Sequence, residues 1–213
     1  MLQTGLNCLL IKVKRKYAEN AQSKIFKMSE IQNMSTVSAA DCVTIIGEVV
    51  SLPVAITDNK FYEGFSTKDI KVGDTAIFRY DVIFDFLQQV QEDNDEPNFK
   101  NRLFYKGEEY FLADIVKIFG VIRGEEIIMV NGYTMVDEFE VSNIVLPQHM
   151  KKTKQTSLTK VLYIGNPKTH LPKLPIQPMD EVYFNPFTAQ HYEIKGKKFC
   201  ILPQEKILGK VQK

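Results

Sequence analysis

Residues 72–78 read VGDTAIF, and residues 178–184 read PMDEVYF. Each stretch places a turn before a short run of mixed apolar and polar residues, and this order predicts a tight turn that leads into a β-strand. The two stretches lie 106 residues apart. Because other stretches recur in the same way, the chain is predicted to contain one structural unit twice.

Three further pairs follow the same order along the chain. GEVVSL at Gly47 returns as TKVLYIG at Thr159, YKGEEYFL at Tyr105 as IKGKKFCIL at Ile194, and DIVKIFGVI at Asp114 as EKILGKV at Glu205. The separation falls from 106 residues at Asp74 to 89 at Gly107, which indicates an insertion of 17 residues in the first copy. The insertion, near residues 82–100, holds a possible short helix and the acidic loop QEDNDEPN.

Short strands at regular spacing, with no helix between successive strands, are typical of small barrels. We therefore predict an all-β protein of two tandem small β-barrels, at residues 1–124 and 125–213, the first of which carries the insertion.

The composition is that of an ordinary globular protein, with 44% hydrophobic and 25% charged residues. No apolar run approaches the ~18 residues of a membrane-spanning helix, and the N-terminal stretch lacks the basic-then-apolar order of a secretory signal. The three cysteines, Cys8, Cys42 and Cys200, form no closely spaced pair. They predict free thiols in a reducing compartment, and we expect a cytoplasmic protein without a membrane partner.

Charge is unevenly distributed along the chain. Residues 141–213 contain 12 lysines, no arginine and 4 acidic residues, a surplus of eight positive charges in a protein whose net charge is +1. Such asymmetry occurs in proteins that bind nucleic acid, and also in proteins whose two halves attract one another. The lysines are scattered and no aromatic residues alternate with them on one stripe, so a nucleic-acid partner is the weaker interpretation.

An isolated apolar triplet, Ile144, Val145 and Leu146, stands in a segment that is otherwise polar and basic. Pro147 ends the run, and the residues up to Lys160 are mostly polar or charged. Three apolar residues on a polar tether are suited to insertion into the groove of another protein. The alternative is an ordinary strand end followed by a solvated loop.

From about Glu126 to Lys213 the chain resembles the GroES/chaperonin-10 family of co-chaperonins. Five stretches occur in the order and approximate spacing of that family: IIMVNGYTMV, NIVLP, TKVLYIGNP, PMDEVYF and EIKGKKFCILPQEKILGKV. The family pattern has a glycine where this chain has Met179.

The resemblance implies a GroES-like barrel with a mobile loop near residues 141–160. It also implies that Ile144, Val145 and Leu146 dock into a groove of a GroEL-type chaperonin and so help it to fold proteins with ATP. The chain itself would need no cofactor or metal, because the chaperonin binds the ATP or ADP.

The resemblance further implies a ring closed by the terminal strands of neighbouring barrels. The residues expected in those oligomer edge strands are Leu9, Leu10, Ile11, Val13, Ile207, Leu208 and Val211. A seven-membered ring cannot consist of whole two-barrel chains, since seven is odd. The chain would therefore form a homo-oligomer of another size or a mixed ring with single-barrel partners.

The first copy is a more divergent match to the same family. In the position of the triplet it has Ile25, Phe26 and Met28, with Lys27 inside the apolar patch. These residues are a possible second chaperonin-binding loop. The other interpretation is that they fix a long loop to the body of the protein.

An enzyme is not expected. The three histidines, His149, His170 and His191, are far apart, and the chain contains no phosphate-binding, dinucleotide-binding or nucleophile-elbow motif. GroES-like barrels also occur in medium-chain dehydrogenases, but those need a Rossmann partner.

Two other functions stay open. One is a structural or assembly subunit, for instance of a phage particle. The other is an oligonucleotide-binding barrel that would use Tyr163, Tyr183 and Phe184. A Ser/Arg-rich transit segment is missing, which favours the cytoplasm of a bacterium or an infected host over a plastid.

Overall fold

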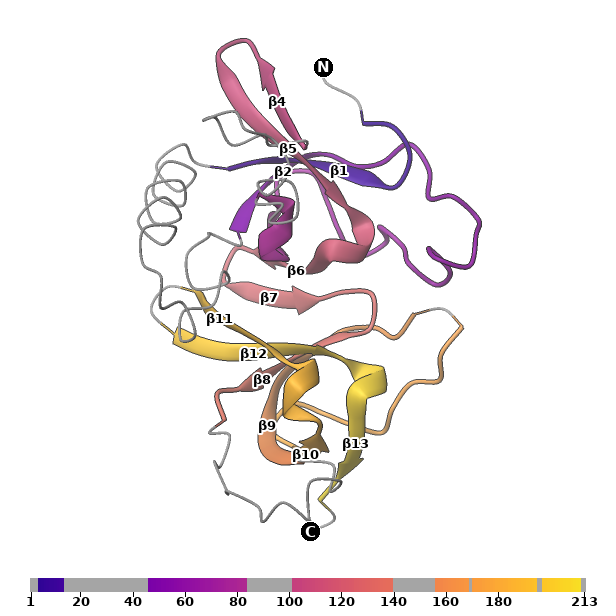
Figure 1. Cartoon of the computed structure of the whole chain (residues 1–213), viewed down its shortest axis with the longest axis vertical. Coiled ribbons are helices and arrows are strands. Elements are labelled where there is room, and N and C mark those ends of the chain that lie inside the picture. The colour runs from indigo at the N-terminus through magenta and orange to yellow at the C-terminus, as the bar shows by residue number, and fades with distance from the viewer. Residues whose placement is uncertain are drawn as a thin grey trace, which may run out of the picture.

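The computed structural model describes residues 4–13, 46–83, 101–139, 156–168, 170–194 and 197–211. These residues form two antiparallel sheets, placed one above the other along the long axis of the molecule (Figure 1). The all-β prediction is confirmed. The described helical segments are single 3-10 turns, and none of the described helices is long and apolar enough to cross a membrane. The triplet at residues 144–146, the apolar residues 25, 26 and 28, and the insertion after residue 83 lie outside the described residues.

The N-terminal sheet has seven strands in the order β4-β5-β1-β2-β3-β6-β7. Their bounds are β1 Cys8–Lys12, β2 Ile46–Ser51, β3 Thr75–Phe78, β4 Arg102–Tyr105, β5 Glu108–Asp114, β6 Ile118–Arg123 and β7 Glu126–Met129. Two 3-10 turns, η2 (Tyr80–Val82) and η3 (Ile115–Lys117), follow β3 and β5.

The C-terminal sheet has six strands in the order β11-β12-β8-β9-β10-β13. Their bounds are β8 Tyr133–Asp137, β9 Ser157–Ile164, β10 Glu181–Phe184, β11 Gln190–Ile194, β12 Lys197–Pro203 and β13 Ile207–Lys210. The turns η5 (Pro186–Thr188) and η6 (Gln204–Lys206) follow β10 and β12.

The strands β8 to β13 follow the arrangement of β1 to β6 strand for strand. The register agrees as well. Both sheets shift register between the first two strands, at Leu10/Ile11 and at Met135/Val136. Both shift again where β3 meets β6 and where β10 meets β13. We call β1–β6 the N-terminal unit and β8–β13 the C-terminal unit.

The strand β7 connects the two units. It follows the predicted boundary at residue 124 but pairs with β6, in the register Gly120↔Met129 to Arg123↔Glu126. Neither sheet closes into a barrel among the described residues, because β4 and β7 end one sheet and β11 and β13 end the other. In this respect the barrel prediction is wrong: each unit is a curved sheet folded over its own core.

Each unit has a core of buried apolar side chains. Phe78, Phe111 and Ile118 are central in the N-terminal unit, and Phe184 and Leu202 in the C-terminal unit. A third buried cluster combines residues of both units, and it is described with the functional site below.

The turn before β3 and the turn before β10 have the same hydrogen bonds. Gly73 N donates to Val49 O at 2.8 Å, and Met179 N donates to Val161 O at 2.7 Å. The backbone φ is +90° at Gly73 and +74° at Met179. Positive φ suits glycine and is strained for a residue with a Cβ atom. The methionine that departs from the family pattern therefore occupies a position whose backbone requires glycine.

We predict that Met179→Gly raises the free energy of unfolding by about 0.5–1 kcal/mol, because the strain relieved exceeds the entropy that glycine loses on folding. The reverse test is Gly73→Ala, where an added Cβ meets no atom within 4 Å and only the positive φ opposes it. The free energy of unfolding of this variant should be lower by about 1 kcal/mol. Urea unfolding of both variants checks the pair, and a destabilised Met179→Gly contradicts the argument.

Candidate functional site

The segment that contains the apolar triplet is attached to two neighbouring strands of the C-terminal unit. β8 ends at Asp137 and β9 begins at Ser157, and these strands pair antiparallel. The hydroxyl of Thr159 donates to Asp137 O at 3.0 Å. Phe139 is buried, with its ring centroid 4.7 Å from that of Phe184. The segment therefore leaves and re-enters the sheet at one end, between anchored residues.

The equivalent segment of the N-terminal unit is attached in the same way, between β1 and β2. At its base Gly47 lies so close to β1 that an added Cβ would be 2.5 Å from Ile11 Cγ2 and 3.0 Å from Lys12 O. Only glycine fits this approach.

The expected edge residues of the first copy are not at an edge. β1 hydrogen-bonds to β2 on one side and to β5 on the other. Leu9, Leu10, Ile11 and Val13 are all buried. The prediction was wrong because β5, which lies about 100 residues further along the chain, occupies the side that we expected to be free.

The expected edge residues at the other end of the chain do lie at an edge. Among the described strands β13 pairs only with β10 and ends its sheet. Ile207 packs against the C-terminal core, and Leu208 points outward with 58% of its side chain exposed. Val211 continues the strand, since its N–H donates to Glu181 O at 2.9 Å.

The two units share one apolar junction, the third buried cluster. The N-terminal unit and β7 contribute Ile77, Phe119 and Met129, and the C-terminal unit contributes Met135, Tyr192, Phe199 and Ile201. The rings of Phe119 and Tyr192 lie 5.5 Å apart between centroids. Tyr133 also donates its hydroxyl to Val116 O at 2.9 Å. The junction is therefore packed and hydrogen-bonded like a protein interior.

Loops of the two units extend the junction on one side. Ser66 N donates to Asn131 Oδ1 at 2.9 Å, and the Lys168 ammonium lies 4.7 Å from the centre of the Phe65 ring. The His170 imidazole occupies the space beside Gly64, where a Cβ would be 2.4 Å from Nδ1. These contacts fix the two units against each other.

The register gives the junction residues within the two units an equivalent in the other unit, while Met129 on β7 has none. Phe119, on β6, is equivalent to Leu208 on β13, and Ile77 is equivalent to Tyr183. Phe119 is 2% exposed and Leu208 is 58% exposed. Tyr183 is likewise exposed, although Ile77 is buried. The C-terminal unit thus leaves exposed the apolar face with which the N-terminal unit contacts it.

The opposite face shows the complementary pattern. Leu103 on β4 is equivalent to Tyr192 on β11, and Tyr105 is equivalent to Ile194. Tyr192 is 4% exposed, while Leu103 is 40% exposed. The N-terminal unit thus leaves exposed the β4 part of the face on which the C-terminal unit receives its neighbour. On β1 and β5 of the same face, Leu10 is buried and Tyr110 and Leu112 are partly buried.

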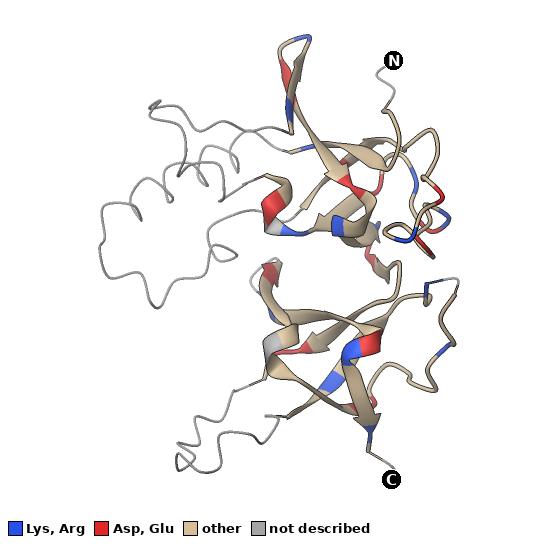
Figure 2. Cartoon of the chain, turned by 45° about the vertical axis from the view of Figure 1, so that its right-hand side comes forward, with Lys and Arg blue, Asp and Glu red and all other residues tan. Residues whose placement is uncertain are grey.

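Charged pairs hold the terminal strand of each unit. Arg123, the last residue of β6, donates two hydrogen bonds to Asp74, of 2.8 Å and 2.7 Å. The hydrogen bonds from Arg123 lower the pKa of Asp74 below its ordinary value. In the C-terminal unit the equivalent carboxylate, Asp180, pairs with Lys210 Nζ at 2.9 Å. Figure 2 shows Lys and Arg interspersed with Asp and Glu in the described parts of both units.

The described residues offer no catalytic nucleophile at the one Cys–His contact. Cys200 Sγ lies 3.2 Å from His191 Nδ1. Burial raises the pKa of the Cys200 thiol to about 12. The thiol is therefore protonated at neutral pH, and only thiolates are good nucleophiles or metal ligands. No group of three or more His, Cys, Asp or Glu in the described part of the chain could hold a metal ion.

The sequence that includes the C-terminal unit matches a known family model. Residues 124–211 match the family model described as Chaperonin 10 Kd subunit. This chaperonin-10 segment begins at the turn before β7 and includes every strand of the C-terminal unit. It covers less than half of the chain, and the N-terminal unit lies outside it. A search of the curated proteins finds no match.

Sequence reasoning missed the junction faces. Phe119 and Leu208 stand in similar stretches, and alternation of apolar residues does not show which of the two acquires a partner. The available signal was the β6–β7 hairpin, where RGEE at residues 123–126 separates two short apolar runs. A turn this short between two runs predicts that the strands pair.

We predict that Asp74→Asn lowers the free energy of unfolding at pH 7 by about 1–3 kcal/mol, the usual contribution of hydrogen bonds to a charged group. Because the folded-state pKa of Asp74 is depressed, its contribution is complete above the unfolded pKa of about 4 and is lost as the pH falls through the folded value. The difference between wild type and variant should therefore shrink below pH 4. Asp180→Asn is the matched control, with a smaller effect because Asp180 is more exposed than Asp74 and accepts one hydrogen bond from Lys210, where Asp74 accepts two from Arg123. A difference that does not change with pH contradicts the prediction.

Proposed function

We propose that the protein is a co-chaperonin that caps a GroEL-type chaperonin ring and assists ATP-dependent protein folding. The observation that carries the proposal is the chaperonin-10 match over residues 124–211. The attachment of residues 140–155 to adjacent strands supports it, because a segment held at both ends can present a short apolar motif to a partner.

Ile144, Val145 and Leu146 are the proposed contact with the chaperonin. Three such side chains bury roughly 300 Å² of apolar surface. At about 25 cal/mol per Å² this burial contributes about 7 kcal/mol to the free energy of binding, before the entropy of ordering is subtracted. Ordering a segment of some fifteen residues offsets most of this gain. Each contact is weak alone, and several contacts on one assembly bind strongly together. This combination suits a cap that must bind and leave in each ATP cycle.

We further propose that the two units are tandem copies of one ancestral unit. Their common strand order, register shifts and turn hydrogen bonds support this relationship. On this proposal the segment between β1 and β2 corresponds to the chaperonin-binding segment of the C-terminal unit. Ile25, Phe26 and Met28 then form the second contact, weakened by Lys27.

The proposed assembly joins chains head to tail through copies of the internal junction. The face with Leu158, Tyr183 and Leu208 would pack on the face with Leu103 and Tyr105 of the next chain. All five side chains are exposed, and their equivalents contribute to the internal junction or pack against it. Ile207, Leu208 and Val211 keep their predicted role in this contact, and β1 does not take part. Every chain supplies two units, so a closed ring of such chains contains an even number of units.

A structural or assembly subunit is the second candidate function. The β4–β5 hairpin favours it, since this hairpin projects from the N-terminal unit (Figure 1) and Phe104 is 66% exposed. The equivalent residue in the C-terminal unit is Glu193, which is also exposed. An apolar residue in place of a charged one at an exposed edge indicates a contact that the other unit does not make.

The proposed function predicts that Val145→Asp abolishes binding to a GroEL-type double ring in the presence of ADP. The aspartate would have to be buried without a partner in an apolar groove. Val72→Asp is the control, because Val72 is an exposed apolar residue of the N-terminal unit and should leave binding unchanged. Co-sedimentation with the double ring measures both. If the intact protein does not bind its cognate ring, the co-chaperonin proposal fails and the structural subunit replaces it.

A further inference from the structure

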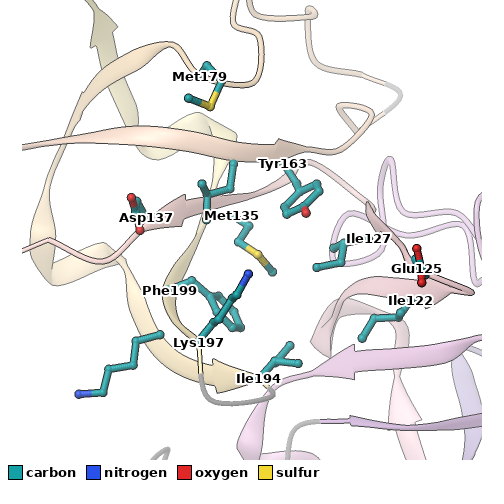
Figure 3. Close-up of a pocket in the computed structure, with 12 residues that line it drawn as sticks. Ile122, Glu125, Ile127, Met135, Asp137, Tyr163, Met179, Ile194, Lys197 and Phe199 are labelled. Atoms are coloured by element: carbon teal, nitrogen blue, oxygen red, sulfur yellow. The ribbon is translucent and has the colours of Figure 1, made fainter.

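A groove runs along the junction between the two units (Figure 3). Its volume is about 740 Å³, which lies within the range of small-molecule sites, and such sites occur preferentially between domains. The apolar residues that line it come from both units: Ile122, Ile127, Met135, Leu162, Ile194 and Phe199.

The apolar floor of the groove is a continuation of the junction cluster. Met135 and Phe199 belong to the buried cluster, and Ile127 and Ile194 pack against it while partly exposed. A ligand that covers these partly exposed carbon atoms removes apolar surface from water, which is favourable by about 25 cal/mol per Å². The floor therefore favours a ligand with a hydrocarbon body.

Two lysines line the groove, Lys197 and Lys198, and Lys197 reaches over this floor. Lys197 lies on the same face of β12 as Phe199, two residues along the strand. In Figure 3 its side chain points into the groove, while Asp137 and Glu125 stand towards opposite ends. In the part of the chain that the structure describes, Lys197 forms no ion pair. An ammonium group above apolar side chains favours a single negative charge on the ligand.

We propose that this groove binds an amphipathic monoanion, a carboxylate with an unbranched hydrocarbon chain of medium length. The chain lies on the floor and the carboxylate pairs with Lys197. Each CH₂ group that is buried contributes about 0.8 kcal/mol, so a chain of several carbons gives measurable affinity without any specific contact. The residues that line the groove all lie outside residues 140–155, and the proposal does not rest on chaperonin binding.

A neutral apolar peptide fits the same groove less well. It would cover the Lys197 ammonium without a hydrogen-bond acceptor of opposite charge, and covering an unpaired charge costs free energy. A ligand with two or more negative charges is opposed by Asp137 and Glu125 at the ends of the groove. The lysines that line the groove favour an anionic ligand, and the carboxylates at its ends oppose a second negative charge on that ligand.

The experiment uses the full chain with a tryptophan reporter. The sequence contains no tryptophan, and Tyr163 lines the groove with a partly exposed side chain. Tyr163→Trp therefore provides a single fluorophore at the site. Titration with decanoate, below the concentration at which it forms micelles, should change the fluorescence to saturation. Decanol, which has the same chain and no charge, should bind at least tenfold more weakly in the same titration.

In the reporter background, Lys197→Met should weaken the binding of decanoate at least tenfold and leave the binding of decanol unchanged. Lys206→Met removes an exposed lysine that does not line the groove and should leave both titrations unchanged. Equal binding of decanoate and decanol, or equal binding with and without Lys197, overturns the proposed anion site. No saturable response to either ligand overturns the groove as a ligand site.

Discussion

The contact between Phe119 and Tyr192 lies at the centre of the junction on which the arrangement of the two units depends. With five other buried side chains from both units and β7, these two form one cluster, and β7 pairs with β6 to bring the chain from one unit into the other. The contact is apolar, so its strength comes from the area removed from water and is not screened by salt as that of an ion pair is. The predicted boundary at residue 124 lies before β7. In the structure β7 pairs with β6, so it belongs to the N-terminal sheet.

A junction made from two equivalent units has a geometric consequence. The face of β3 and β6 in the N-terminal unit is covered, and the equivalent face of β10 and β13 is open. The face of β11 and β12 in the C-terminal unit is covered, and in the N-terminal unit β4 leaves apolar side chains of the equivalent face exposed. In the proposed assembly this interface of unlike faces repeats between copies, as a ring if the rotation closes and as a filament if it does not. The chaperonin-10 segment supplies one unit of this series, and the N-terminal unit is proposed as the other.

Much of the fold could be predicted from sequence because its signals are local. The turns at Gly73 and Gly107, and the apolar runs beside them, lie within a few residues of the strands that they define. The role of β1 could not be predicted in this way, because it depends on pairing with β5, about 100 residues away. Closure into barrels was likewise a non-local expectation, and it was wrong. For the candidate site the sequence identified Leu208, but an apolar residue at an edge looks the same whether its partner lies in the same chain, as for Phe119, or outside it.

The measurement that tests the central claim most directly is chemical cross-linking between two single-cysteine variants. Leu103 and Leu208 are the equivalents of Tyr192 and Phe119, whose rings are 5.5 Å apart within the chain. In a background with Cys8→Ser, Cys42→Ser and Cys200→Ala, chains with Leu103→Cys are mixed with chains with Leu208→Cys and treated with a short bismaleimide. If the internal junction is repeated between chains, a covalent dimer forms in the mixture and not with either variant alone. If the mixture gives no more dimer than the separate variants, the two exposed faces do not bind each other and the proposed head-to-tail assembly is wrong.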